Sequence, residues 1–354
     1  MDSDAGKSSS NNVAKLAPPG PGITGLVVRV LDQLSLAAWL PAALLTASMA
    51  VLFRFRANEN LDLGQAISDI TADPLALLVS LVPLLVVTTM VTQAFSFNAI
   101  RVLEGYGRPR GILTPVRRVL IRWHVRRKSS LEKRRLTANS RAFAVARPRL
   151  LQSGFSHSVV DMLESQALET AEPDVTDEDR RVAEAMGWRS YCDPWRLASI
   201  DSIIEEQKRY PTQGRVLPTR LGNVLRSVED ELDEVGGDVG GFVMRNKNLL
   251  PDNLRADHDH YRTRLDMYAM LVAIGLILAA VSPLMLVGAI ATWSGILVVS
   301  GLFILLSLTS YHAAITSATA YGSILLELNR LVKSATKQTV PLVAETSSES
   351  TYSG

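Results

Sequence analysis

Residues 267–314 read MYAMLVAIGLILAAVSPLMLVGAIATWSGILVVSGLFILLSLTSYHAA, and this stretch decides the fold. It belongs to a run of 60 residues between Asp266 and Glu327 that contains no Asp, Glu, Lys or Arg. The hydrocarbon core of a bilayer is about 30 Å thick and takes roughly 20 helical residues, so the run is long enough to cross twice. Its midpoint, GAIATWSG, combines turn-forming Gly with a Trp that suits the interface. We therefore predict two transmembrane helices, 267–287 and 296–314.

Two shorter uncharged runs lie nearer the start of the chain. There are 21 residues between Asp32 and Arg54, and 27 between Asp73 and Arg101. Each suits one span, whereas a buried helix of a soluble protein is usually shorter and interrupted by charge. The polar, acidic first residues do not resemble a cleaved signal peptide, so the first run is interpreted as a retained anchor. The predicted helices are 34–53 and 75–95.

The predicted fold class is an all-α integral membrane protein with four transmembrane helices, in two pairs that flank a mainly helical cytoplasmic domain. No Gly or Pro interrupts the sequence from Asp252 to Gly275, so one helix is expected to run from the domain into the third span. The fourth span is expected to continue as a helix to about Ala335. Ser-rich and Pro-rich ends predict disorder. The expected order is a disordered tail at 1–22, the first helix pair within 23–100, the basic domain at 101–265, the second pair with its extension at 266–335, and a disordered tail at 336–354.

The distribution of basic residues predicts the orientation. Residues 101–149 hold 15 Lys and Arg against two acids, whereas residues 54–73 hold two Arg against four acids. Flanks rich in Lys and Arg stay in the cytoplasm. We therefore expect a multi-pass protein of the plasma (inner) membrane with both termini in the cytoplasm.

The most basic part of the domain reads RRVLIRWHVRRKSSLEKRRL at residues 117–136. Val116, Val119, Leu120 and Trp123 follow helical spacing, and basic residues fill much of the remainder. The favoured interpretation is a helix that contacts anionic lipid headgroups at the inner leaflet. Packing against the acidic segment 161–179 is the second interpretation, and a nucleic-acid site is the least favoured. The expected headgroup contacts are Arg117, Arg118, Arg122, Trp123, Arg126, Arg127 and Lys128.

Small residues recur at helical spacing in two of the spans. Such stripes allow helices to approach closely in lipid. Packing within the chain is the favoured interpretation, and a homodimer seam is the alternative. Gly222 lies on another predicted helix, which begins near Pro218. Within a helix Gly costs up to about 1 kcal/mol of stability relative to Ala, so we expect close packing at this position. The expected helix-packing residues are Ala38, Ala42, Thr46, Ala314, Ala318 and Gly322.

The sequence offers little for chemistry. The predicted spans contain no Asp, Glu, Lys or Arg, which disfavours coupled transport. In ADHDHYR only Asp257 and His260 share a helix face, and two ligands do not make a metal site. The single cysteine, Cys192, allows no internal disulfide. His124 is isolated in the sequence from any nucleophile. We predict no catalytic, cofactor-binding or metal residues.

Several strings of this chain, taken together, resemble a group of uncharacterised actinobacterial membrane proteins. The resemblance extends over most of residues 30–335 and implies a bacterial plasma membrane, four spans and a cytoplasmic helical domain. It brings no activity, cofactor or catalytic residue. Members of the group often have Trp at the position of Gly107. This chain therefore lacks one aromatic anchor at the membrane interface. The strings are LSLAAWLPAALL (34–45), VTQAFSFNAIRVLEGYG (91–107), RYPTQGRVLPTRLGNVLRSVED (209–230), NLLPDNLRADHDHYRTRLD (248–266) and AYGSILLELNR (320–330).

The functional expectation is a non-enzymatic membrane protein whose cytoplasmic domain docks a partner or senses the inner leaflet. The alternative is an oligomeric channel or permeation component. Expected partners are the lipid bilayer with its anionic headgroups, and a second copy or another protein. A nucleic acid partner is disfavoured, and no cofactor is expected.

Overall fold

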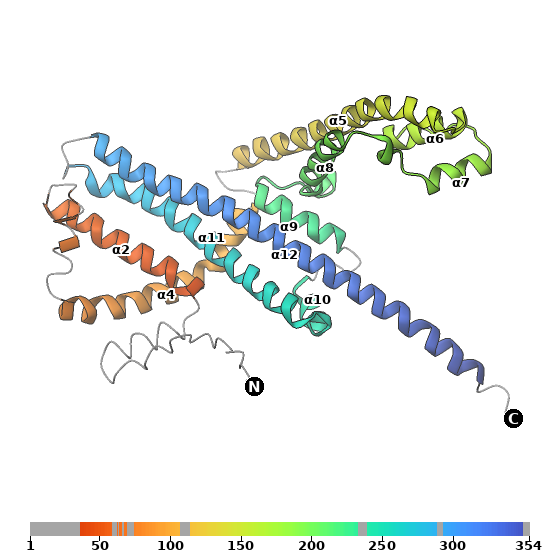
Figure 1. The fold of residues 1–354 in the computed structure, drawn as a ribbon. Helices are drawn as coiled ribbons and strands as arrows, with labels where there is room; N and C mark the ends of the chain where they lie inside the picture. Colours follow the sequence, from red (N-terminus) through yellow and green to blue (C-terminus); the bar gives the residue numbers. More distant parts are fainter. Residues whose placement is uncertain are drawn as a thin grey trace, which may run out of the picture. The chain divides into compact units, whose positions relative to one another are not determined.

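The computed structural model describes residues 36–58, 62, 64, 65, 67, 68, 74–106, 114–232, 239–288 and 293–349, with the side chains of all of these except 36–38, 74–81, 213 and 336–349. These residues are mostly helical, and no strand occurs among them (Figure 1). The elements are α2 (Leu36–Asn58), α4 (Pro74–Glu104), α5 (Thr114–Gln152), α6 (His157–Leu168), α7 (Asp177–Ala185), η1 (Trp188–Tyr191), α8 (Pro194–Lys208), η2 (Gln213–Arg215), α9 (Arg220–Glu231), α10 (Val239–Asn246), η4 (Lys247–Leu249), α11 (Asp252–Leu286) and α12 (Trp293–Glu349).

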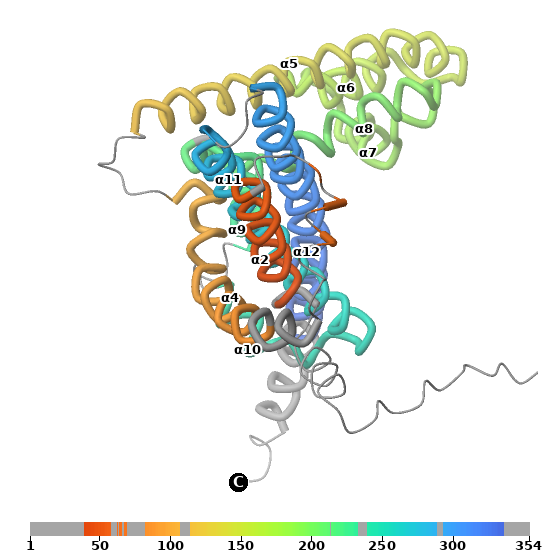
Figure 2. The backbone as a smooth tube through the Cα atoms, turned by 90° about the vertical axis from the view of Figure 1, so that its left-hand side faces the viewer, coloured from red at the N-terminus to blue at the C-terminus, as the bar shows by residue number. Residues whose placement is uncertain are grey.

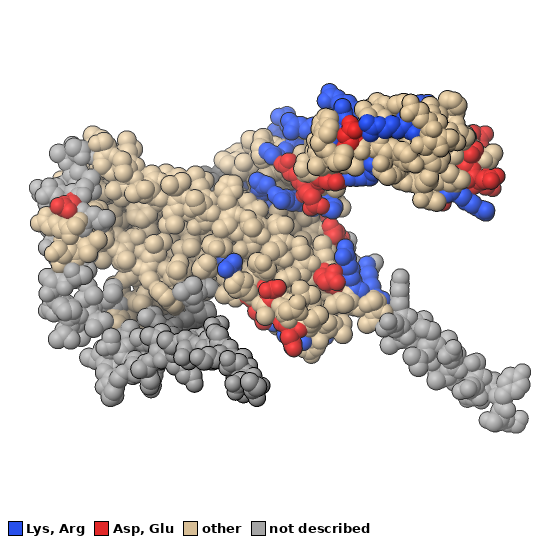
Figure 3. All heavy atoms as spheres, viewed as in Figure 1, with Lys and Arg blue, Asp and Glu red and all other residues tan. Residues whose placement is uncertain are grey.

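Four of these helices, α2, α4, α11 and α12, are long and apolar enough to cross a membrane. They coincide with the four predicted spans and confirm their number and their places in the sequence. The two expected continuations are also confirmed, because α11 begins at Asp252 and α12 runs past Ala335 without a break. In Figure 3 the charged side chains gather over the helices between α4 and α11, the first part of α11 and the later part of α12, whereas the apolar parts of the four long helices show almost none.

The chain divides into two compact units, Met1–Ala94 with Ala280–Val299, and Phe95–Ala279 with Ser300–Gly354. In the first unit α2 buries Ala42 and Thr46, and the Thr46 hydroxyl donates to the Ala42 carbonyl at 2.8 Å. Near the end of α2, Arg56 Nη1 donates to the carbonyl oxygen of Met285 at 3.1 Å. A cation at the last carbonyls of a helix is favourable because of the helix dipole. The C-terminal ends of α2 and α11 are therefore joined.

In the second unit α11 and α12 approach each other closely at a glycine. A Cβ on Gly275 would lie 3.0 Å from the carbonyl oxygen of Phe303 and 3.0 Å from the Cβ of Ser307. Ser307 Oγ donates to the carbonyl oxygen of Val272 at 3.2 Å. Small residues and hydroxyl groups at such a contact allow the two backbones to pack in an apolar surrounding.

Helix α9 packs against the end of α4 and against α12 through two further glycines. A Cβ on Gly222 would overlap the backbone carbonyl oxygen of Glu104, the last residue of α4. A Cβ on Gly322 of α12 would lie 2.5 Å from Cγ2 of Val228. Thr219 caps α9 by accepting from the amide of Gly222 at 3.1 Å. The predicted close packing at position 222 is confirmed, and its partner is backbone.

Helices α6, α7 and α8 pack with the C-terminal half of α5 around their own core (Figure 2). The rings of Phe143 and Trp188 meet edge to face with centroids 5.7 Å apart. The Thr176 hydroxyl accepts from the amide of Asp179 at 3.2 Å and so caps the N-terminus of α7. The core residues are Ala142, Phe143, Ala146, Leu150, Val159, Val160, Met162, Leu163, Ala167, Ala183, Trp188, Cys192 and Ile200.

Helix α5 is 39 residues long, because no Gly or Pro occurs between Pro115 and Pro148 and the helix buries Leu131, Phe143 and Leu150 along its length. Two boundaries of other helices differ from expectation. Helix α4 continues to Glu104, and α12 extends to Glu349, beyond the expected start of the C-terminal tail. The expected N-terminal tail lies outside the described residues.

Candidate anion-binding surface on helix α5

The basic residues of α5 fall into two groups with different surroundings. In its second half the guanidinium groups pair with acids of α6 and of the residues that flank it: Arg135 with Glu169 at 2.7 Å, and Arg147 with Asp161 at 2.8 Å and also with Glu164. Arg149 likewise pairs with a carboxylate, at the start of α8. This part of the helix therefore uses its charge to pack against acidic segments, as the second interpretation of the sequence proposes.

The first half of α5 exposes an apolar row, which we define as Val116, Val119, Leu120 and Trp123. Val119 is 62% exposed and Trp123 is 51% exposed. At 3.6 residues per turn these positions share one face of the helix. A soluble surface tolerates single exposed apolar residues, but a continuous row with basic neighbours is typical of a helix that lies at a membrane surface.

Three arginines, Arg118, Arg122 and Arg126, form a second row one turn apart. Arg126 and Arg122 border the apolar row, and Arg118 lies farther round the helix. All three are exposed. No carboxylate within the described ranges of the chain forms an ion pair with any of them. Arginines so close in sequence repel one another, so their surface has a positive potential that favours an anion.

A hollow of about 270 Å³ lies on the same face of α5, directly C-terminal to the apolar row. The guanidinium of Arg127 lies over the Trp123 ring, 5.5 Å from its centroid, and fixes one side of the hollow. Leu131 forms its floor and is buried. The residues that line the hollow are Trp123, Arg126, Arg127, Ser130, Leu131 and Arg134.

The opposite face of α5 is anchored to the loop 209–219. His124 is 5% exposed, and its Nδ1 lies 3.2 Å from the hydroxyl of Tyr210. Lys128 Nζ donates to the carbonyl oxygen of Pro211 at 2.6 Å. Arg127 also binds Glu206 at 2.5 Å. Arg127 and Lys128, both among the expected headgroup contacts, thus bind protein groups.

These contacts change the acidity of the groups involved. Burial lowers the pKa of His124 below its usual 6.5, and the nearby Arg127 and Arg220 lower it further. The hydrogen bond from Arg127 holds the pKa of Glu206 below its ordinary value. At neutral pH His124 is therefore uncharged and Glu206 is ionised. These charge states suit the contact of the His124 ring with Tyr210 and the ion pair of Glu206 with Arg127.

A pH dependence follows from His124. The unfolded chain binds a proton at His124 near pH 6.5, whereas the folded chain does so only at lower pH, so stability falls as the pH drops through about 6.5. We expect His124→Gln to reduce the loss of thermal stability of the detergent-solubilised full chain between about pH 7.5 and about pH 5.5. The measurement is the unfolding temperature across this range. The exposed His157→Gln should keep the wild-type dependence, and equal slopes in all three chains would contradict the assignment.

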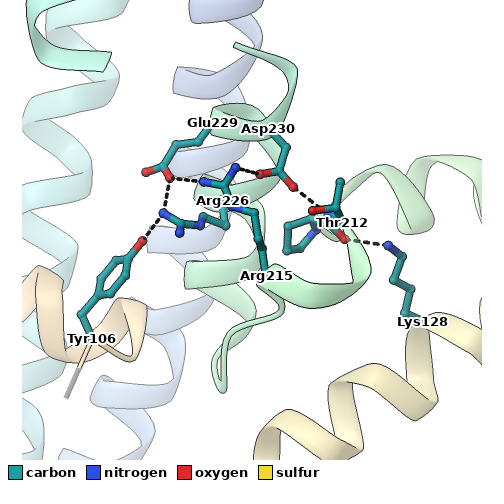
Figure 4. Close-up of polar contacts among 8 residues, drawn as sticks. Tyr106, Lys128, Thr212, Arg215, Arg226, Glu229 and Asp230 are labelled. Atoms are coloured by element: carbon teal, nitrogen blue, oxygen red, sulfur yellow. Dashed lines mark hydrogen bonds and ion pairs between the residues drawn. The ribbon is translucent and has the colours of Figure 1, made fainter. Parts of the chain in front are cut away.

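A polar network connects the loop 209–219 with α9 and with Tyr106, two residues after the end of α4 (Figure 4). Asp230 accepts from the amide of Thr212 at 2.7 Å and pairs with Arg215 at 2.5 Å. Arg226 pairs with Glu229 at 2.7 Å. Its Nη1 also donates to the hydroxyl of Tyr106 at 2.9 Å. The network links the anchor of α5 to the end of a membrane helix.

A buried amide completes this link. Asn223 of α9 is 1% exposed; its Oδ1 accepts from the amide of Leu217 at 2.7 Å, and its Nδ2 donates to the carbonyl oxygen of the same residue at 3.0 Å. At Gly105, where φ is +88°, a Cβ would overlap the ring of Pro218. Sequence reasoning missed these residues, because their partners are distant or lie in an irregular loop.

The other residues that the sequence singles out have structural surroundings. Ala314 and Ala318 are buried against Leu221 and Val224 of α9, which places them within the chain's own core. The side chain of Ala38 lies outside the described ones. The described residues contain no group of three His, Cys, Asp or Glu that could hold a metal ion. His258 Nδ1 lies 3.0 Å from Oδ1 of Asp259.

Comparison of the chain with protein-family models, curated proteins and solved structures gives no match.

Proposed function

We propose that this chain is a four-span protein of the plasma membrane whose domain 101–265 lies in the cytoplasm and senses anionic lipids of the inner leaflet, without catalysis. The single observation that carries the proposal is the first half of α5. It carries an exposed apolar row and, along the same turns of the helix, three arginines that no acid in the described part of the chain neutralises. Each basic side chain near an anionic membrane surface contributes about 1 kcal/mol of attraction.

Two further observations support the orientation. The Arg-rich segment follows directly after α4, as expected for a cytoplasmic flank. The contact of Arg56 with Met285 joins the C-terminal ends of α2 and α11, and these ends share one membrane face if both spans leave the cytoplasm in the same direction. Both facts agree with four spans and two cytoplasmic termini.

The contacts of α5 suggest how the headgroup signal reaches the spans. When lipid binds to the face of α5 that carries the apolar row, the helix would shift. The shift would act on the face where His124 and Lys128 contact the loop 209–219. That loop is bound to α9 through Asn223. Helix α9 packs at Gly222 on the backbone of Glu104 in α4, and its Val228 side chain packs on Gly322 of α12. A shift of α5 would therefore pass through the loop and α9 to two membrane helices.

A fluorescent label tests the proposal. In a Cys192→Ala background, Val119→Cys carries an environment-sensitive dye at the centre of the apolar row. We expect its emission to shift to the blue in nanodiscs that contain phosphatidylglycerol, relative to phosphatidylcholine alone, because the row enters the interface. Salt at about 1 M, where the Debye length is about 3 Å, should reverse much of the shift.

Two controls make this measurement specific. A label at Glu178→Cys, on the exposed start of α7, should not respond to lipid charge. The variant Arg118→Gln/Arg122→Gln/Arg126→Gln should lose most of the response at position 119. Equal emission in neutral and anionic bilayers, or a response that survives the triple substitution, would refute lipid sensing by α5.

A further inference from the structure

The hollow C-terminal to the apolar row differs from the rest of the α5 surface in shape and in charge. It is a concave site with a hydroxyl at its centre, since Ser130 lies four residues from Arg126 and four from Arg134. All three side chains are exposed. Neither of these two arginines forms an ion pair with a described residue of the chain, whereas Arg127 is already bound to Glu206. Two uncompensated guanidinium groups thus flank one hydroxyl.

We infer that this hollow binds a phosphomonoester group. Guanidinium groups bind phosphate through planar, charge-assisted hydrogen bonds, which are about twice as strong as neutral ones. A phosphomonoester carries a charge of about −1.5 to −2 at pH 7 and three acceptor oxygens, which matches two guanidinium groups and one hydroxyl donor. A phosphodiester carries only one charge and leaves one arginine without compensation.

The neighbourhood of the hollow favours a lipid as the source of this group. Trp123 belongs both to the apolar row and to the wall of the hollow. From Val116 to Arg134 the common face extends for about 27 Å at a rise of about 1.5 Å per residue. Acyl chains beside the apolar row would place a headgroup over Ser130. The identification of the ligand as a lipid rests on the proposed function, whereas recognition of the phosphate group depends only on the hollow.

The test measures lipid preference on the full-length protein in detergent by native mass spectrometry. Phosphatidic acid, a phosphomonoester, competes with phosphatidylglycerol, a phosphodiester with the same acyl chains. We expect wild type to prefer phosphatidic acid by about tenfold, the size of one charge-assisted hydrogen bond. Arg126→Gln/Arg134→Gln should abolish this preference, and Ser130→Asp, which adds a negative charge to the hollow, should do the same.

The matched control removes the same number of charges from the neighbouring surface. Arg118→Gln/Arg122→Gln should lower total lipid binding and leave the ratio of the two lipids unchanged. A second arm adds soluble glycerol phosphate: competition with phosphatidic acid at comparable concentration would identify a soluble phosphomonoester as the ligand, and absence of competition identifies the lipid. Because Arg126 and Arg134 form no ion pair with a described residue, their substitution removes none of these, and unfolding temperatures equal to that of wild type would verify that the variants fold.

The outcomes separate the two proposals. If wild type shows no preference, or if both double variants change the ratio equally, the phosphomonoester site is wrong even where anionic lipids still bind. If no anionic lipid binds more than phosphatidylcholine and soluble phosphate still binds at the hollow, the inner-leaflet function is wrong and the site stands.

Discussion

Gly222→Ala is expected to lower the stability of the full chain by about 2 kcal/mol. The added Cβ meets the backbone carbonyl oxygen of Glu104, and its carbonyl carbon would lie only 2.9 Å away. Backbone does not rotate aside as a flexible side chain does, so α9 must move off the end of α4. The usual gain of about 1 kcal/mol for Ala over Gly in a helix offsets only part of this cost.

The measurement is the unfolding temperature of the detergent-solubilised protein at a fixed scan rate, since unfolding of membrane proteins is often irreversible. Gly301→Ala in α12 is the matched control, because nothing lies within 4 Å of a Cβ at that position. We expect it to unfold at or slightly above the wild-type temperature, because the added Cβ meets nothing and Ala is favoured over Gly in a helix. Similar losses in the two variants would show that helix packing at Gly222 is looser than the structure indicates.

Asn223→Ala is expected to cost about 2–4 kcal/mol, because it leaves both backbone groups of Leu217 without partners. Asn223 is 1% exposed and Leu217 is 8% exposed, so water does not readily replace the amide. Asn223→Asp should not restore stability, since it places a second acceptor against the carbonyl oxygen of Leu217. The loop 209–219 is expected to loosen in both variants.

Hydrogen exchange at the Leu217 amide, together with the unfolding temperature, measures this effect. Asn139→Ala is the comparator, because Asn139 Nδ2 donates to the carbonyl oxygen of Ala167 at 2.9 Å at a different place on α5. That variant should leave exchange at Leu217 unchanged. Retained protection of Leu217 in Asn223→Ala would mean that this amide does not hold the loop.

The sequence predicts the membrane helices well because their signal is local. Charge-free runs identify α2, α4, α11 and α12, and the absence of Gly and Pro after Asp252 predicts the continuous α11. Gly222 is also predictable, because a costly residue on an amphipathic helix indicates close packing. Its partner is not predictable, since the end of α4 lies more than a hundred residues earlier in the chain.

The anchor of α5 could not be predicted in the same way. His124 looks isolated in the sequence because Tyr210, its partner, lies 86 residues later. The basic residues of α5 look alike in composition, yet Arg135 and Arg147 pair with acids, whereas Arg118 and Arg122 pair with none within the described chain. Which arginine meets an acid depends on how α6 and α8 fold back, and periodicity carries no information about that.

The bond from Arg56 to Met285 has a consequence for how the protein is made. The two residues are 229 positions apart. A ribosome adds about 5–20 residues per second, so α2 enters the bilayer roughly 10–45 s before α11 exists. During this interval the first membrane helices have only lipid or each other as neighbours. Assembly of the first compact unit is therefore a late, post-insertion event, and a nascent chain stopped before residue 280 would leave α2 without its final partner.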